Sequence, residues 1–163
     1  MYEKVLVPLD GSALAECTLS HVKNLFRDGS VGDVTLLNVV KVDIPWTLMG
    51  SDEAPTKAFD LNAIRKTLFV KSRKYLADIK SRLVCEGIKV KTESLEGNRP
   101  ADIITEYAQK KDMDMIIIGT HGYTGMKKLM LGSVASSVLH QSHIPVLLIR
   151  PESCRSKKRA TNK

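Results

Sequence analysis

Cysteine is scarce in this chain of 163 residues, which has only Cys17, Cys85 and Cys154 and no Cys-x-x-Cys pair. An odd number of cysteines without that spacing argues against a disulfide framework and against a thiolate metal site. Cys17 and Cys85 fall in helical patterns, so we expect both to be core or half-buried side chains. No run approaches the roughly 20 apolar residues of a membrane span, and the N-terminus has no signal-peptide pattern. We therefore expect a cytoplasmic protein.

Aromatic residues are also few, at 5% of the chain, and they do not alternate with basic residues as in proteins that bind single strands. The net charge of +7 is unevenly distributed, because residues 150–163 carry six Lys and Arg against one Glu. These last residues therefore account for +5 of the total. The sequence predicts a single domain over residues 1–150, a basic, disordered tail over 151–163, and no specific nucleic-acid partner.

Two common phosphate-binding patterns are missing as well. No frame fits the P-loop, and His121 breaks the dinucleotide pattern Gly-x-Gly-x-x-Gly. Instead, the chain contains Gly119-x2-Gly122-x9-Gly132-Ser133, directly after the apolar run 115–118 and before a helical pattern. A strand, a glycine-rich turn and a helix start favour an anion such as phosphate, because glycine allows positive φ and close backbone approach. A purely structural turn with a glycine cap remains the alternative.

Apolar runs and alternation predict five strands, over residues 4–10, 34–40, 88–95, 113–118 and 144–149. Helical spacing fills the connections between them, with one long helix from Leu61 that stops near Gly87 and another that begins at Pro100. Residues 41–60 fit neither pattern, and we expect either a lid or partner-contacting segment or a surface loop. Strands alternating with helices predict an α/β fold with a doubly wound parallel sheet, strand order 3-2-1-4-5 and helices on both faces.

This strand order places a ligand crevice at the carboxyl ends of strands 1 and 4, where the chain reverses direction across the sheet. Asp10 ends the first of these strands and Gly119 ends the other. The turn after the first strand and the glycine segment, which hold the candidate ligand-binding residues, are therefore expected to meet at one place.

On these residues the chain resembles the universal stress protein family, in its ATP-binding branch. The resemblance covers about 150 residues: the opening Lys4-Val5-Leu6-Val7-Pro8-Leu9-Asp10-Gly11-Ser12, the strand Leu36-Leu37-Asn38-Val39, the glycine signature, and Pro145-Val146-Leu147-Leu148-Ile149. It implies a Rossmann-like fold of the adenine nucleotide alpha hydrolase kind, with ATP and Mg²⁺ as ligands. Asn38 departs from the pattern, because many relatives carry His or Tyr at that position.

The resemblance also implies which residues hold the nucleotide. The adenine contacts carry over to Pro8, Leu9, Asp10 and Val39. The ribose and phosphate contacts carry over to Ile118, Gly119, Gly122, Gly132, Ser133 and Val134. His121 lies inside the loop, where it could bond phosphate or ribose or serve only the turn.

Members of this family pair their last strand across a twofold axis, which here implies a homodimer through Val146, Leu147, Leu148 and Ile149. A wholly apolar edge strand would otherwise invite aggregation, so the physical argument agrees. We expect an ATP-binding regulatory protein of the stress response that acts on an unidentified protein partner. The alternatives are a slow ATPase or adenylyl-transferring enzyme that uses the same crevice, and a structural dimer without nucleotide.

Overall fold

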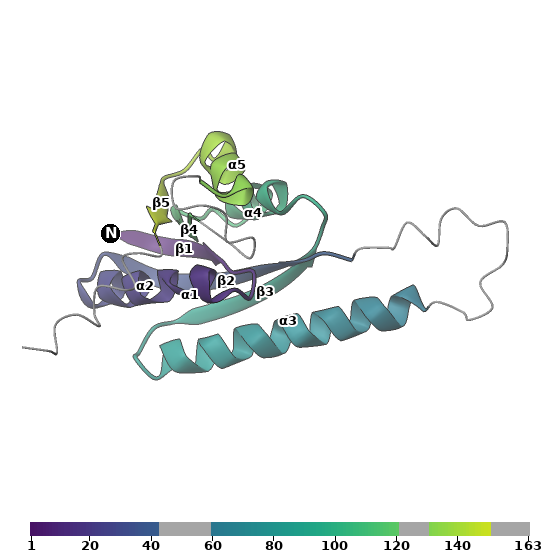
Figure 1. Ribbon diagram of the computed structural model, residues 1–163. Coiled ribbons are helices and arrows are strands. Elements are labelled where there is room, and N and C mark those ends of the chain that lie inside the picture. The colour runs from purple at the N-terminus through teal and green to yellow at the C-terminus, as the bar shows by residue number, and fades with distance from the viewer. Residues whose placement is uncertain (43–59, 121–130, 151–163) are drawn as a thin grey trace, which may run out of the picture.

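Five parallel strands form one sheet in the computed structural model, which describes residues 1–42, 60–120 and 131–150 (Figure 1). The strand order is β3-β2-β1-β4-β5, with every neighbouring pair parallel. This confirms the predicted doubly wound α/β fold. The strands are β1 (Tyr2–Pro8), β2 (Val31–Val40), β3 (Val90–Glu96), β4 (Met115–Gly119) and β5 (Val146–Ile149).

The helices cover both faces of the sheet (Figure 1). One face carries α1, α2 and the long α3, and the other carries α4 and α5. Their bounds are α1 (Ala13–Glu16), α2 (Thr18–Arg27), α3 (Leu61–Val84), α4 (Pro100–Lys110) and α5 (Ser133–Gln141).

Local signals set several of these helix ends. The Asp60 side chain accepts from the amides of Asn62 and Ala63 at 3.0 and 3.1 Å, which caps the start of α3. Past the end of the same helix, Gly87 has φ +85°, a conformation that glycine adopts without strain. Pro100 stands at the first turn of α4, as predicted.

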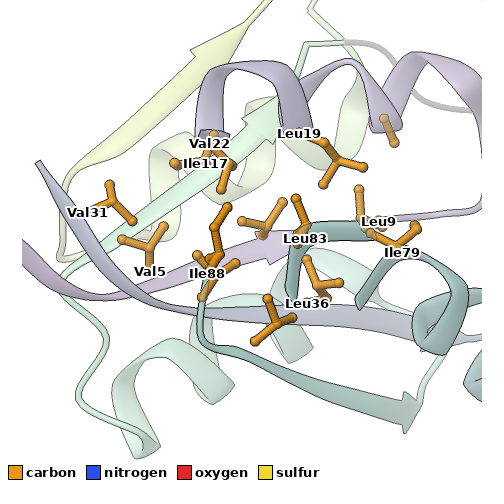
Figure 2. Close-up of a cluster of buried hydrophobic side chains, with 14 of the residues drawn as sticks. Val5, Leu9, Leu19, Val22, Val31, Leu36, Ile79, Leu83, Ile88 and Ile117 are labelled. Atoms are coloured by element: carbon orange, nitrogen blue, oxygen red, sulfur yellow. The ribbon is translucent and has the colours of Figure 1, made fainter. Parts of the chain in front are cut away.

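Each face of the sheet has its own hydrophobic core. Figure 2 shows the larger one, in which side chains of β1, β2 and β4 meet those of α2 and α3. The side chains labelled there are Val5, Leu9, Leu19, Val22, Val31, Leu36, Ile79, Leu83, Ile88 and Ile117. The second core lies under α4 and α5 and contains Leu6, Leu37, Ala101, Ile104, Ala108, Met113, Ile116, Ile118, Ala135 and Val138. Burial on both faces explains the continuous apolar runs of the central strands.

The structure differs from the sequence-based expectation in detail. The first predicted helix is split at Cys17 into α1 and α2. The last two strands begin at Met115 and Val146, two residues later than predicted, because apolar character marks burial as well as strand pairing. Cys17 is half-buried as expected, whereas Cys85 is exposed beyond the end of α3. Residues 43–59, most of the predicted lid or loop, and the predicted tail lie outside the described residues.

Over the described parts of the chain, no helix is both long enough and apolar enough to cross a bilayer. The 24-residue α3 illustrates why, since Arg65, Lys66, Lys71, Arg73 and Lys74 all lie in its first fourteen residues.

Leu83→Ala should destabilise the fold by about 3 kcal/mol, because Leu83 is fully buried between α3 and the sheet and its loss leaves a cavity. Val84→Ala is the matched control. Val84 is the next residue and is 49% exposed, so this substitution should change the free energy of unfolding by less than about 0.5 kcal/mol. Urea unfolding of both variants measures the difference. Equal unfolding free energies for the two variants would contradict the assigned core.

Candidate functional site

The candidate site lies where β1 and β4 run side by side with their carboxyl ends at the same edge of the sheet. Consecutive strands lead outward from β1 in one direction, toward β3, and from β4 in the other, toward β5. The sheet therefore has its topological switch point between β1 and β4, where doubly wound folds bind ligands. Pro8 and Leu9 are buried at the end of β1, and Asp10 is exposed just beyond them.

Asp10 is held by the turn that connects β1 to α1. Its Oδ1 accepts from the backbone amide of Ser12 at 3.0 Å and from the Ser12 hydroxyl at 2.6 Å. The same hydroxyl accepts from the amide of Ala15 at 3.1 Å, so Ser12 caps α1. Gly11 makes the turn possible with φ +83°. These bonds fix the direction of the Asp10 carboxylate at the carboxyl edge of the sheet.

Tyr75 of α3 is close enough to this turn for its ionisation to depend on it. Burial of the Tyr75 hydroxyl raises its pKa, and the carboxylates of Glu16 and Asp10 raise it further. Tyr75 therefore stays neutral at any physiological pH.

The two ends of the glycine segment lie next to each other. Gly119 ends β4, and the carbonyl of the buried Thr120 accepts from the amide of Gly132 at 2.7 Å. Gly132 is the N-cap residue of α5 and itself has no side chain to cap that helix. The amides of Ser133 and Val134 in the first turn are thus positioned at the carboxyl end of β4, where an anion would gain from the helix dipole.

The described glycines of the signature, Gly119 and Gly132, do not use the positive φ that glycine allows. Positive φ angles among the described glycines occur at Gly11, Gly29 and Gly87, and neither Gly119 nor Gly132 is among them. Gly132 has φ −60° and ψ 149°, which any residue can adopt. The argument for glycine at position 132 is therefore close backbone approach alone. His121 and Gly122 lie outside the described residues.

The end of the neighbouring strand, β2, holds a residue that sequence reasoning did not include in the site, Asn38, and a hydrogen bond joins it to the end of β1. The Asn38 side-chain amide donates to the carbonyl of Leu9 at 2.7 Å, between the ends of β2 and β1. Its oxygen accepts from the hydroxyl of Ser72, which also bonds the hydroxyl of Ser94, both at 2.7 Å. Val39 follows directly and is half-buried. Two features of the sequence could have pointed to this connection: a polar residue in an apolar strand, and a serine in the buried stripe of α3.

A cavity of about 170 Å³ lies elsewhere, between α3 and the helices α1 and α2. Its lining residues are Glu16, Leu19, Ser20, Lys23, Ile79, Arg82 and Leu83. No predicted site residue is among them, so this cavity is separate from the switch point.

Comparison with known proteins agrees with the motifs. The family model described as the universal stress protein family matches residues 1–150. The chain belongs to the universal stress protein family. This confirms the resemblance seen in its sequence.

Two relatives come from the archaeon Methanocaldococcus jannaschii. Universal stress protein MJ0577 is 34% identical over 158 residues, which cover 92% of this chain and 96% of that protein. Universal stress protein MJ0531 is 32% identical over 150 residues, which cover 92% and 83%. The solved structure of MJ0577 has a TM-score of 0.75 to this chain at 33% identity and covers 92% of this chain and 96% of its own.

More distant structures share the fold. A universal stress protein family protein from Arabidopsis thaliana, solved with AMP bound, has a TM-score of 0.62 at 18% identity and covers 91% of each chain. A universal stress protein solved in complex with cAMP has a TM-score of 0.58, also at 18% identity, and covers 92% of this chain and 98% of its own. Both of these members of the fold hold adenine nucleotides.

Proposed function

We propose that this universal stress protein binds ATP at the carboxyl edge of β1 and β4 and works as a nucleotide-dependent regulatory protein in the stress response. The observation that carries the proposal is the bond between Gly132 and Thr120, because it holds the first turn of α5 against the end of β4. A triphosphate placed there would meet the first-turn amides of α5 on a backbone without a bulky side chain at position 132. The adenine nucleotides held by two structural neighbours support the choice of base.

The proposed contacts divide into two groups. The base lies against the ends of β1 and β2, and the ribose and phosphates lie along the glycine segment. The residues of the first group are Pro8, Leu9, Asp10 and Val39, and those of the second are Ile118, Gly119, His121, Gly122, Gly132, Ser133 and Val134.

Mg²⁺ fits this arrangement as a companion of the nucleotide. The ion is usually held by one or two carboxylates together with substrate phosphates, and Asp10 supplies a carboxylate at this edge. Among the described residues there is no group of three His, Cys, Asp or Glu that could hold a metal. The phosphates would therefore complete the coordination, and the ion would neutralise part of their charge.

The arrangement supports a binding protein better than an enzyme. Asp10 supplies the carboxylate among the proposed contact residues. Its Oδ1 accepts hydrogen bonds from both the amide and the hydroxyl of Ser12. Action as a general base would also need a partner to relay the proton, and the described residues of the proposed set supply no second acidic or basic side chain. We therefore assign Asp10 to orientation of the turn and of the bound ion.

We also propose that the protein is a homodimer through β5, at the edge of the sheet. The carbonyls of Pro145 and Ile149 accept, both at 2.9 Å, from the backbone of β4 and the residue that follows it. Because hydrogen bonds alternate along a strand, the peptide groups of Val146 and Leu148 face away from β4. A second copy would satisfy these groups and cover the apolar side chains.

ATP should raise the melting temperature of the protein. A ligand present at 100 times its dissociation constant stabilises the fold by about 2.7 kcal/mol, which corresponds to about 5–10 °C for a chain of this size. Differential scanning fluorimetry with ATP and Mg²⁺, and calorimetric titration for the affinity, measure this. Chromatography of the bound nucleotide after incubation distinguishes intact ATP from hydrolysis products. No shift and no heat at millimolar ATP would refute the proposed function.

A further inference from the structure

The backbone ladder between β1 and β2 stops one bond short at the proposed adenine site. The pairing runs to Pro8 opposite Leu37, and the Leu9 amide continues it by donating to the Leu37 carbonyl at 2.8 Å. In a regular parallel ladder the next bond would run from the Val39 amide to the Leu9 carbonyl. Within the described residues, no backbone hydrogen bond joins those two groups. The Leu9 carbonyl accepts from the side chain of Asn38 instead.

The Val39 amide is directed toward β1. On the other side of β2, the amide of Val34 donates to β3, and the carbonyl of Val40 accepts from Gly97, at 2.9 and 3.1 Å. Because donors and acceptors alternate along a strand, the even-numbered residues of β2 serve β3 and the odd-numbered ones face β1. The amide of Val39 therefore faces the gap where β1 and β2 separate, at the carboxyl edge of the sheet.

The orientation of the Asn38 side chain is fixed by its three neighbours. The Leu9 carbonyl can only accept, so the amide nitrogen of Asn38 must face it. The oxygen of Asn38 then accepts from the hydroxyl of Ser72, a residue only 7% exposed, and that hydroxyl in turn accepts from Ser94. A flipped side chain would place the oxygens of Asn38 and Leu9 against each other with no proton between them, and would lose the bond from the Ser72 hydroxyl to the Asn38 oxygen.

We propose that Asn38 is a positioning residue that keeps the Val39 amide open for the edge of adenine, and that Ser72 and Ser94 lock it in that role. The inference rests on the proposed function. An amide donor matches N1 of adenine, which is an acceptor, and opposes N1 of guanine, which carries a hydrogen. Asn38 thus supports the preference for adenine over guanine without touching the base.

Hydrogen exchange in the nucleotide-free protein tests the opening itself. In the wild type the amide of Val39 should exchange faster than that of Leu37, which lies inside the ladder. In Asn38→Ala the Leu9 carbonyl is released and can take the Val39 amide, so exchange at Val39 should slow about tenfold, the effect of one net hydrogen bond of about 1.4 kcal/mol. Exchange at Val39 as slow as at Leu37 in the wild type, or unchanged by Asn38→Ala, overturns the proposal.

Nucleotide affinities test the consequence. Asn38→Ala and Ser72→Ala should each weaken the affinity for ATP by about 3- to 10-fold and leave the affinity for GTP nearly unchanged. The preference for ATP over GTP should therefore fall. Ser81→Ala is the matched control, because its hydroxyl bonds the Ala77 carbonyl on the exposed side of the same helix. It should keep the wild-type preference. A general loss of packing would weaken both nucleotides alike, and that result also overturns the proposal.

The outcomes distinguish a failure of the proposed ATP binding from a failure of the proposed role of Asn38. A wild type that binds no ATP refutes the proposed function and the role in base reading together. A wild type that binds ATP, with the preference unchanged in Asn38→Ala and Ser72→Ala, overturns only the role of Asn38. If Asn38→Ala does not fold, Ser72→Ala decides, since it removes one hydroxyl from the lock and leaves the strand sequence intact.

Discussion

Gly132→Val should reduce ATP affinity by about 100-fold or more, equivalent to about 2.7 kcal/mol of binding free energy. Its amide lies 2.7 Å from the Thr120 carbonyl, so a branched side chain would stand between the end of β4 and the first amides of α5. The backbone at this position has φ −60° and ψ 149°, which valine adopts readily. The fold should therefore survive, and calorimetric titration with ATP measures the loss.

Gly132→Ala is the graded control for that experiment. Its single methyl group should cause a smaller loss than valine at the same backbone conformation. Circular dichroism melting of the nucleotide-free variants checks that both are folded. Wild-type affinity in a folded Gly132→Val protein would show that the phosphates lie elsewhere.

Val146→Pro should convert the proposed homodimer into a monomer, with the dimer dissociation constant raised by at least about 100-fold, or about 2.7 kcal/mol. Proline removes the outward-facing amide at the first residue of β5, a strand position where proline is tolerated. An aspartate at 146 or 148 would be less informative, because both side chains pack against the second core. Sedimentation velocity measures the assembly state.

Val146→Thr is the matched control, because it has nearly the same shape as valine and keeps the amide. It should sediment like the wild type, apart from a small loss of stability caused by the hydroxyl. If the wild type is itself monomeric, or if Val146→Pro sediments as a dimer, pairing through β5 is wrong.

The order of the strands could be predicted from the sequence because apolar runs separated by helical patterns permit few topologies. The bounds of individual elements were harder to predict. Met113 is buried at 8% exposure but precedes β4, so its apolar character reports packing under α4 rather than strand pairing. Cys85 fits the helical pattern, although α3 ends at Val84 and leaves it exposed.

The location of the candidate site could be predicted from topology, whereas the contacts among its residues could not. The sequence places Asp10 and Gly119 at strand ends, and the sheet brings those ends together. The bond between Asn38 and Ser72 joins residues 34 positions apart, and no local pattern specifies such a partner. The sequence pattern allowed either positive φ or close backbone approach at Gly132, and only the backbone, with φ −60°, excludes the first.

The backbone of Thr120 is anchored in two directions. Its N–H group donates to the carbonyl of Ile149 at 2.9 Å, and its carbonyl accepts from Gly132 at 2.7 Å. A shift at the first turn of α5 is therefore transmitted through a single residue to the point where the chain leaves the sheet. Coupling free energies are reciprocal. If pairing at β5 changes the affinity for a ligand at the first turn of α5, that ligand changes the strength of pairing by the same factor.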